Sequence, residues 1–192
     1  MEGVGIALTA EMRSGKDTVG KILIEEYGFK RYAFGDGIVE ICKQLFPHMF
    51  TGTKPRKLLQ EFGQEQVARH RTVWIDYMFA KMQTDGIDPQ KDNIVITDLR
   101  QPHEYKALVD CGFYVVRVNA SLETRIERML KNGELVSPEI LEHNTEKHIR
   151  NYKVDYEIDN NGTPEQLYEN VKEMIRFIGG MGREWSYIVR NG

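Results

Sequence analysis

The residues best suited to chemistry form a short loop near the N-terminus, Ala10–Thr18, with the sequence A-E-M-R-S-G-K-D-T. An apolar run precedes this loop, and a helical pattern follows it. A helix start leaves backbone N–H groups unpaired and carries a partial positive charge, so a turn of small residues there can surround a phosphate. Lys16 adds a full positive charge at the β/γ end of a phosphate chain. The pattern predicts a phosphate-binding loop. The alternative is an ordinary strand–turn–helix with a solvated lysine.

This loop departs from the usual pattern G-x-x-x-x-G-K-[ST] in two places. Ala10 holds the first glycine position, and Asp17 follows the lysine, so the hydroxyl comes one residue later at Thr18. We expect Ala10 to work only if the turn does not require a positive φ there. The residues expected to bind ATP here are Arg13, Ser14, Gly15, Lys16, Asp17 and Thr18. Asp17 and Thr18 are also expected beside Mg²⁺.

Several arginines could bind an acceptor that itself carries a phosphate. Phosphoryl transfer depends on alignment and charge neutralisation, and arginine can bind two phosphate oxygens at once. Arg100 follows the apolar run 93–97, and open α/β sheets bind ligands at the ends of such strands. The other candidates are Arg56, Arg69 and Arg71. Each of the four has an alternative role as a solvated surface residue.

Two carboxylates, Asp36 and Asp98, each follow an expected strand. Asp36 lies between two glycines after a short strand pattern, so its carboxylate is expected in an open turn, where aspartate is commonly a turn former. Asp98 follows the run 93–97, which fits either a magnesium-linked carboxylate or a helix cap ahead of Pro102. Gln60, Trp74 and Tyr77 could contact a flat group of the acceptor, although aromatic residues at helical spacing more often belong to a core.

The elements that must position these residues alternate between strand and helix patterns. Such alternation predicts a parallel sheet with helices on both faces. The expected strands are residues 3–9, 30–34, 93–97, 113–118 and 156–158. The expected helices are residues 16–27, 38–46, 54–68, 72–83, 102–110 and 121–131, the last capped by Ser121, and a final helix capped by Thr163. Residues 132–149 are polar and mixed, and the pattern does not place the tail 179–192.

Several motifs resemble one family of kinases. The stretch S-G-K-D-T at 14–18 resembles the loop of phage-type deoxynucleoside monophosphate kinases and is similar to that of animal-type phosphomevalonate kinases. Further resemblances follow in the same order, at residues 32–38, 55–60 with Gly63, 97–104 and 155–163, the last of them shared with dephospho-coenzyme A kinases. The resemblance implies a three-layer α/β P-loop kinase fold with a five-stranded parallel sheet, as in nucleoside monophosphate kinases. We expect one domain over 1–192, an acceptor-binding helical region near 47–90 and a lid near 125–150.

The same resemblance implies roles for individual residues. Asp36 would face the acceptor and orient or deprotonate its hydroxyl. Arg128, rather than Arg125, would contact the ATP phosphates from the lid. Asn160, Asn161 and Gly162 would lie against adenine. The expected catalytic residues are Lys16, Asp36, Arg100 and Arg128. Dephospho-coenzyme A kinases carry another arginine four residues after Arg128, where this chain has Asn132, so its lid would be weaker or rearranged. The polar segment 133–148 would close over the site and exclude water.

The leading hypothesis is an ATP- and Mg²⁺-dependent phosphotransferase acting on a (deoxy)nucleoside monophosphate. The alternatives are a kinase for dephospho-coenzyme A or phosphomevalonate, and a nucleotide-binding protein without efficient catalysis. The 192 residues carry a net charge of −3 and no basic run, which argues against nucleic acid as a partner. No apolar run approaches the roughly 20 residues that span a bilayer, and no signal-peptide layout begins the chain, so we expect a cytoplasmic protein without membrane contact. A homodimer is a further expectation.

Two residue types are expected to be structural. Cys42 and Cys111 are predicted to be buried, reduced thiols, because they lie far apart in apolar contexts. The histidines show no metal-ligand spacing and are predicted to lie at the surface. They are His48, His70, His103, His143 and His148.

Overall fold

The computed structural model describes residues 3–137 and 144–187, without the side chains of 144–147. Its centre is a five-stranded sheet in the order β2-β3-β1-β4-β5. The strands are β1 Gly5–Ala10, β2 Lys30–Tyr32, β3 Ile94–Ile96, β4 Tyr114–Asn119 and β5 Tyr156–Asp159. Every pairing is parallel, so the carboxyl ends of all strands meet at one edge. The chain leaves β1 and β4 in opposite directions, which makes their shared carboxyl edge the place where such sheets bind ligands.

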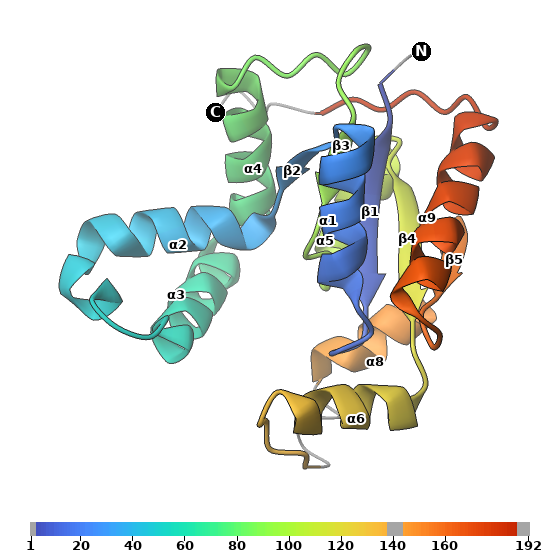
Figure 1. Cartoon of the computed structure of the whole chain (residues 1–192). Helices are drawn as coiled ribbons and strands as arrows, with labels where there is room; N and C mark the ends of the chain where they lie inside the picture. The colour runs from blue at the N-terminus through green and yellow to red at the C-terminus, as the bar shows by residue number, and fades with distance from the viewer. Residues whose placement is uncertain (1–2, 138–143, 188–192) are drawn as a thin grey trace.

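Helices cover both faces of this sheet (Figure 1). Helices α1 (Lys16–Tyr27) and α9 (Pro164–Gly179) lie on one face, and α4 (Val73–Thr84) and α5 (Pro102–Asp110) lie on the other. Helices α2 (Phe34–Leu45) and α3 (Arg56–Arg69) extend to one side with α4, joined by a 3-10 turn at Pro47–Phe50. At the carboxyl edge lie α6 (Leu122–Lys131) and α8 (Asn144–Asn151). The expected three-layer P-loop kinase-like fold is confirmed.

Alternation along the buried strands divides the core in two. Successive side chains of a strand point to opposite faces of its sheet. In β1, Ile6 and Leu8 therefore pack with α1 and α9, whereas Ala7 joins the cluster that α4 and α5 cover. The strands contribute apolar residues to both faces, which is typical of a parallel sheet covered by helices on each side.

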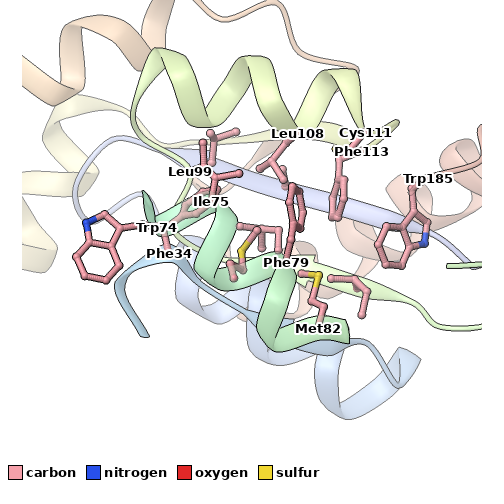
Figure 2. Packing of buried hydrophobic residues seen from close by; sticks show 14 of the residues in the cluster. Phe34, Trp74, Ile75, Phe79, Met82, Leu99, Leu108, Cys111, Phe113 and Trp185 are labelled. Atoms are coloured by element: carbon pink, nitrogen blue, oxygen red, sulfur yellow. The ribbon is translucent and has the colours of Figure 1, made fainter. Parts of the chain in front are cut away.

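The tail after α9 completes the hydrophobic cluster between the sheet and helices α4 and α5. Figure 2 shows Phe79 and Met82 of α4 beside Phe113, with Trp185 at the end of the row. Trp185 is 3% exposed, and its ring centroid lies 5.1 Å from that of Phe113. The Ser186 N–H donates to the carbonyl of Cys111 at 2.8 Å. The described part of this tail, up to residue 187, thus runs across the amino edge of the sheet, opposite the loop that follows β1.

Most element boundaries agree with the sequence-based expectations, and α1 and α5 agree at both ends. Ser121 and Thr163 cap α6 and α9 as expected. Helix α2 begins at Phe34, four residues before the expected start, and the preceding strand correspondingly ends at Tyr32. Helix α8 lies in the segment for which the pattern predicted no helix. Within the described residues, no helix has the length and apolar character needed to cross a bilayer.

The residues expected to be structural are mostly where the sequence placed them. Both cysteines are buried. Among the histidines, His48, His70 and His148 are exposed and His103 is half-buried, while His143 lies outside the described residues. No group of three or more potential metal-ligating side chains occurs within the part of the chain that the structure describes.

Candidate functional site

The loop after β1 has the backbone of a phosphate-binding turn. Gly15 stands at the N-terminus of α1 with φ 94°, and Arg13 also has a positive φ, 64°. A Cβ added at Gly15 would lie 2.0 Å from the Asn160 Nδ2 atom, so both φ and space require glycine there. Ala10 is the last residue of β1 and is not among the positive-φ residues. Alanine therefore fits at the first glycine position of the motif.

The loop borders a cavity of about 1210 Å³ at the carboxyl edge of the sheet. Cationic side chains line this cavity from separate parts of the chain: Lys16 on α1, Arg100 after β3, Arg128 on α6, Arg56 at the start of α3 and Lys54 two residues before it. Asp17, Thr18, Asn160 and Gly162 also line it. The cavity thus combines a helix N-terminus with several cations, the arrangement that favours polyanionic ligands.

The Lys16 side chain reaches from the start of α1 to the end of β3. Its Nζ donates to the main-chain carbonyl of Thr97, the residue after β3, and lies 3.0 Å from the Asp17 Oδ1 atom. The Lys16 side chain is 12% exposed, whereas the Asp17 side chain is 97% exposed. The Lys16 ammonium group lines the cavity, and its charge also acts on the nearby Asp98 carboxyl.

Side chains from distant segments bind main-chain carbonyls of the loop. The Asn160 Nδ2 donates to the Ser14 carbonyl at 2.7 Å. Arg128 donates from Nη1 to the Arg13 carbonyl at 3.2 Å and from Nη2 to the Asn160 carbonyl at 2.8 Å. Buried Arg125 donates from Nε to the Met12 carbonyl at 2.8 Å. The resemblance gave Arg128 and Asn160 to ATP; in this structure both are bonded to the loop.

Three ion pairs add to these contacts. Glu11 is paired with Arg125, with 2.8 Å between Arg125 Nη1 and Glu11 Oε2, and with Arg150 of α8. Arg13 is paired with Glu134, which follows α6. These contacts come from the part of the chain that was expected to form the lid. Residues 138–143 of that expected lid lie outside the described residues.

Asp98 caps a helix. Its Oδ1 accepts the Phe34 N–H and its Oδ2 accepts the Gly35 N–H, each at 2.9 Å. These bonds explain why α2 begins earlier than the sequence pattern predicts. The helix that starts at Pro102 is capped instead by Gln101. Burial raises the pKa of the Asp98 carboxyl, while the two N–H bonds and Lys16 act in the opposite direction.

Asp36 lies outside the loop cavity. Arg31 donates to both of its carboxylate oxygens, at 2.8 and 3.2 Å, and the pair lines a separate cavity of about 320 Å³ with Tyr77 and Glu40. Among the described residues, the lining of the loop cavity also does not include Gln60, Arg69 or Arg71, which are exposed. Of the expected acceptor-binding residues, Arg56 and Arg100 are brought together with the loop.

Three other residues singled out in the sequence have structural contacts. Trp74 is buried and donates from Nε1 to the Gly63 carbonyl at 3.1 Å. Tyr77 packs edge-on against Trp74. The Asn161 Oδ1 accepts the Ser121 N–H at 2.7 Å, beside the N-terminus of α6. The cavity lining includes Asn160 and Gly162 but not Asn161.

Sequence reasoning missed the residues that fix Arg100. The Glu104 Oε2 accepts the N–H groups of Arg100 and Gln101 at 3.0 and 2.8 Å, and the Tyr152 hydroxyl donates to the Arg100 carbonyl at 2.8 Å. Burial raises the pKa of Glu104 to about 7. The signal for Glu104 was present, because Gln101 and Glu104 have capping-box spacing. Lys54 was also missed, although it stands two residues before Arg56.

Comparison with a family model decides where this chain belongs. The model of the AAA domain matches residues 6–151, which include the loop, β1 to β4 and α6. The chain belongs to this P-loop family. The comparison with curated protein sequences found no match.

Solved structures share the fold of this AAA domain protein at low sequence identity. A gluconokinase from Sinorhizobium meliloti 1021 is 17% identical with a TM-score of 0.56, and the match covers 93% of each chain. A sugar kinase from Janibacter sp. HTCC2649 is 14% identical with a TM-score of 0.56, over 92% of this chain and 95% of that one. Deoxyadenosine kinase from M. mycoides, with bound dATP, is 13% identical with a TM-score of 0.50, over 90% and 100% of the chains. At these identities the likeness establishes the fold alone.

Proposed function

We propose that this protein is an ATP-dependent small-molecule kinase whose acceptor already carries a phosphate, with a (deoxy)nucleoside monophosphate as the leading candidate. The observation that carries the proposal is the cavity at the phosphate loop, into which Lys54, Arg56 and Arg100 reach in addition to Lys16. The gluconokinase and the deoxyadenosine kinase that share this fold support the reaction class without defining the acceptor.

The number of cations favours two phosphate-bearing ligands. The N-terminus of α1 and Lys16 are suited to the phosphate chain of ATP. Arg56 and Arg100 come from two other elements, and arginine is the residue type best suited to bind two phosphate oxygens. These arginines would hold the phosphate of the acceptor in line with the γ-phosphorus, and such alignment is the main contribution of a phosphoryl-transfer enzyme.

The position of Asp36 favours a phosphate oxygen as the nucleophile. A hydroxyl acceptor needs a general base within hydrogen-bond reach, whereas a phosphate monoester has a second pKa near 6 and is already ionised at neutral pH. Asp36, the expected base, is paired with Arg31 in a separate cavity. This supports a nucleoside monophosphate, or phosphomevalonate as the second candidate, over the hydroxyl of dephospho-coenzyme A.

The proposed phosphoryl transfer needs no general base, because the attacking oxygen is already ionised. An ionised oxygen of the acceptor phosphate forms a bond to the γ-phosphorus of ATP. The bond between that phosphorus and the bridging oxygen breaks, and its electron pair leaves with ADP. The main chain of Arg100 is held by Glu104 and Tyr152 on either side, so this side chain starts from a fixed anchor. Electrostatic stabilisation by fixed cations lowers the barrier most when the groups need no rearrangement.

Mg²⁺ fits the oxygen groups that follow Lys16. The exposed carboxylate of Asp17 and the hydroxyl of Thr18 are hard ligands of the kind that Mg²⁺ prefers, and both line the cavity. Either would hold the ion together with the phosphates of ATP, where it would neutralise negative charge. Asp98 stays a weaker candidate, because both of its oxygens already accept main-chain N–H groups.

The test is ADP release from ATP and Mg²⁺ in a coupled assay. The acceptors are all nucleoside and deoxynucleoside monophosphates, phosphomevalonate, dephospho-coenzyme A and gluconate. We expect turnover on a phosphate-bearing acceptor, a loss of at least about 100-fold in Lys16→Ala, and nearly full activity in the control Lys21→Ala. Lys21 is an exposed residue of the same helix, with its Nζ 3.8 Å from Glu25 Oε1.

Other results of this assay would change the assignment. Turnover on gluconate or dephospho-coenzyme A alone would overturn the phosphate-oxygen acceptor. Tight ATP binding with no turnover on any acceptor would overturn the kinase and support a nucleotide-binding protein without efficient catalysis.

A further inference from the structure

Three successive carbonyls of the phosphate loop are bound by side chains from the C-terminal half of the chain. Arg125 binds the carbonyl of Met12, Arg128 that of Arg13 and Asn160 that of Ser14. The shortest of these bonds, 2.7 Å, is the one from Asn160. It joins the residue after β5 to a loop 146 positions earlier in the sequence.

The stereochemistry of the peptide unit gives these bonds a consequence. In a planar trans peptide, the carbonyl of one residue and the N–H of the next point in opposite directions. The bond from Asn160 to the Ser14 carbonyl therefore orients the N–H of Gly15 away from Asn160. Gly15 stands at the N-terminus of α1, where N–H groups are available to a bound phosphate.

Burial and further hydrogen bonds hold the Asn160 side chain in the position from which it binds the Ser14 carbonyl. Asn160 is 6% exposed, and its own carbonyl accepts from Arg128 at 2.8 Å. Its main-chain N–H donates to the Asn119 carbonyl at 2.8 Å, so the residue is anchored to β4. Because the side chain lies where a Cβ of residue 15 would be, it also limits the positions that the loop can adopt.

We infer that Asn160 is a positioning residue, which holds the Ser14–Gly15 peptide with its N–H toward the phosphates of a bound nucleotide. The inference rests on the proposed function, in that the loop must bind a phosphate chain. It differs from the adenine contact that the family resemblance implies. An adenine contact would contribute only to ligands that contain the base, whereas loop positioning contributes to every ligand with the phosphate chain.

The experiment measures the affinity of the full chain for ADP and for tripolyphosphate by calorimetry, with no acceptor present. In Asn160→Asp, a carboxylate oxygen replaces the donor and faces the Ser14 carbonyl. We expect affinity for both ligands to fall by about 10-fold or more at pH 8, because a buried hydrogen bond is replaced by repulsion.

The matched control is Asn170→Asp. Asn170 donates from Nδ2 to the carbonyl of Asp159 at 2.9 Å, one residue before Asn160 and without a contact to the loop among the described bonds. Asn170→Asp places the same negative charge against the carbonyl of Asp159 instead of that of Ser14. We expect both ligands to bind the control with unchanged affinity.

A pH series separates positioning from general damage. A buried carboxyl facing a carbonyl has a raised pKa, and its protonated form can again donate to the Ser14 carbonyl. The affinity of Asn160→Asp relative to the unmodified chain should therefore recover as the pH falls from 8 to 5. If Asn160→Asp does not fold, Asn160→Ala removes the donor without adding charge and should weaken both ligands by about 3-fold or more.

Each outcome bears on the inference. Weakened ADP with unchanged tripolyphosphate would overturn it in favour of an adenine contact, and unchanged binding of both ligands would overturn it outright. A wild-type chain that binds neither ligand would overturn both this inference and the proposed function. Binding that responds to Asn160→Asp as expected, in a protein with no acceptor turnover, would support the positioning role and overturn only the kinase.

Discussion

At the scale of single residues, Asp36 separates two kinds of acceptor. We predict that Asp36→Asn changes kcat by less than about threefold, because a phosphate-oxygen nucleophile needs no base, and general-base catalysis contributes typically 10²- to 10⁴-fold where it operates. The measurement is steady-state kinetics with the best acceptor from the ADP-release assay.

Asp85→Asn provides the comparison for Asp36, because Asp85 lines the same cavity and accepts the Tyr32 hydroxyl at 2.8 Å. A loss of 100-fold or more in Asp36→Asn alone would show that the carboxylate leaves Arg31 and acts as the base that the family resemblance implies.

At the scale of elements, Glu104 in the first turn of α5 makes the free energy of unfolding depend on pH. The pKa of Glu104 is about 7 in the folded chain against 4.5 for the free side chain. Between these pH values the folded form keeps a proton that the unfolded form has lost, so the free energy of unfolding falls as pH rises through this window, by at most about 3 kcal/mol. Glu104→Gln has no carboxyl proton to lose, so this pH dependence is absent from the variant. We predict that its stability relative to the unmodified chain increases from pH 5 to pH 8 in urea unfolding.

Glu165→Gln is the matched control for this effect. Glu165 also lies in the first turn of a helix and next to a proline, but it is solvent-exposed and its pKa is lowered. Its substitution should give no gain in stability at higher pH. Unfolding curves of Glu104→Gln and the unmodified chain that stay parallel from pH 5 to pH 8 would contradict the role assigned to Glu104.

At the scale of the whole molecule, the tail and the site lie at opposite edges of the sheet. Trp185 packs on Phe113, and the Arg183 side chain binds both oxygens of Asp155 at 3.1 and 2.6 Å. We predict that Trp185→Ala lowers the free energy of unfolding by about 3–5 kcal/mol, because a buried aromatic ring is lost. Trp185→Phe should recover part of this loss, and its affinity for ADP should equal that of the unmodified chain.

Phe177→Ala tests whether the effect of Trp185 comes from burial. Phe177 is 48% exposed on α9, so we expect a cost well below that of Trp185→Ala. Equal costs for the two substitutions, or a changed ADP affinity in Trp185→Phe, would contradict the view that the tail stabilises the fold without contributing to the site.

The sequence by itself determined the elements whose signals are local. The phosphate loop, both ends of α1 and the caps at Ser121 and Thr163 follow from residues within a few positions of one another. The alternation of strand and helix patterns was sufficient for a parallel sheet with helices on both faces. Hydrophobic periodicity and cap chemistry act over one or two turns, so they can be read without knowing the neighbours in space.

Only the tertiary structure decided which distant residues meet. The start of α2 depends on Asp98, more than 60 positions away, and a hydrogen bond to the loop comes from Asn160, at a separation of 146 positions. The order β2-β3-β1-β4-β5 brings these residues to one edge, and local periodicity does not encode that order. The same holds for Trp185, whose burial requires the amino edge of the assembled sheet. A motif defines what a residue can do, whereas strand order defines which partners it has.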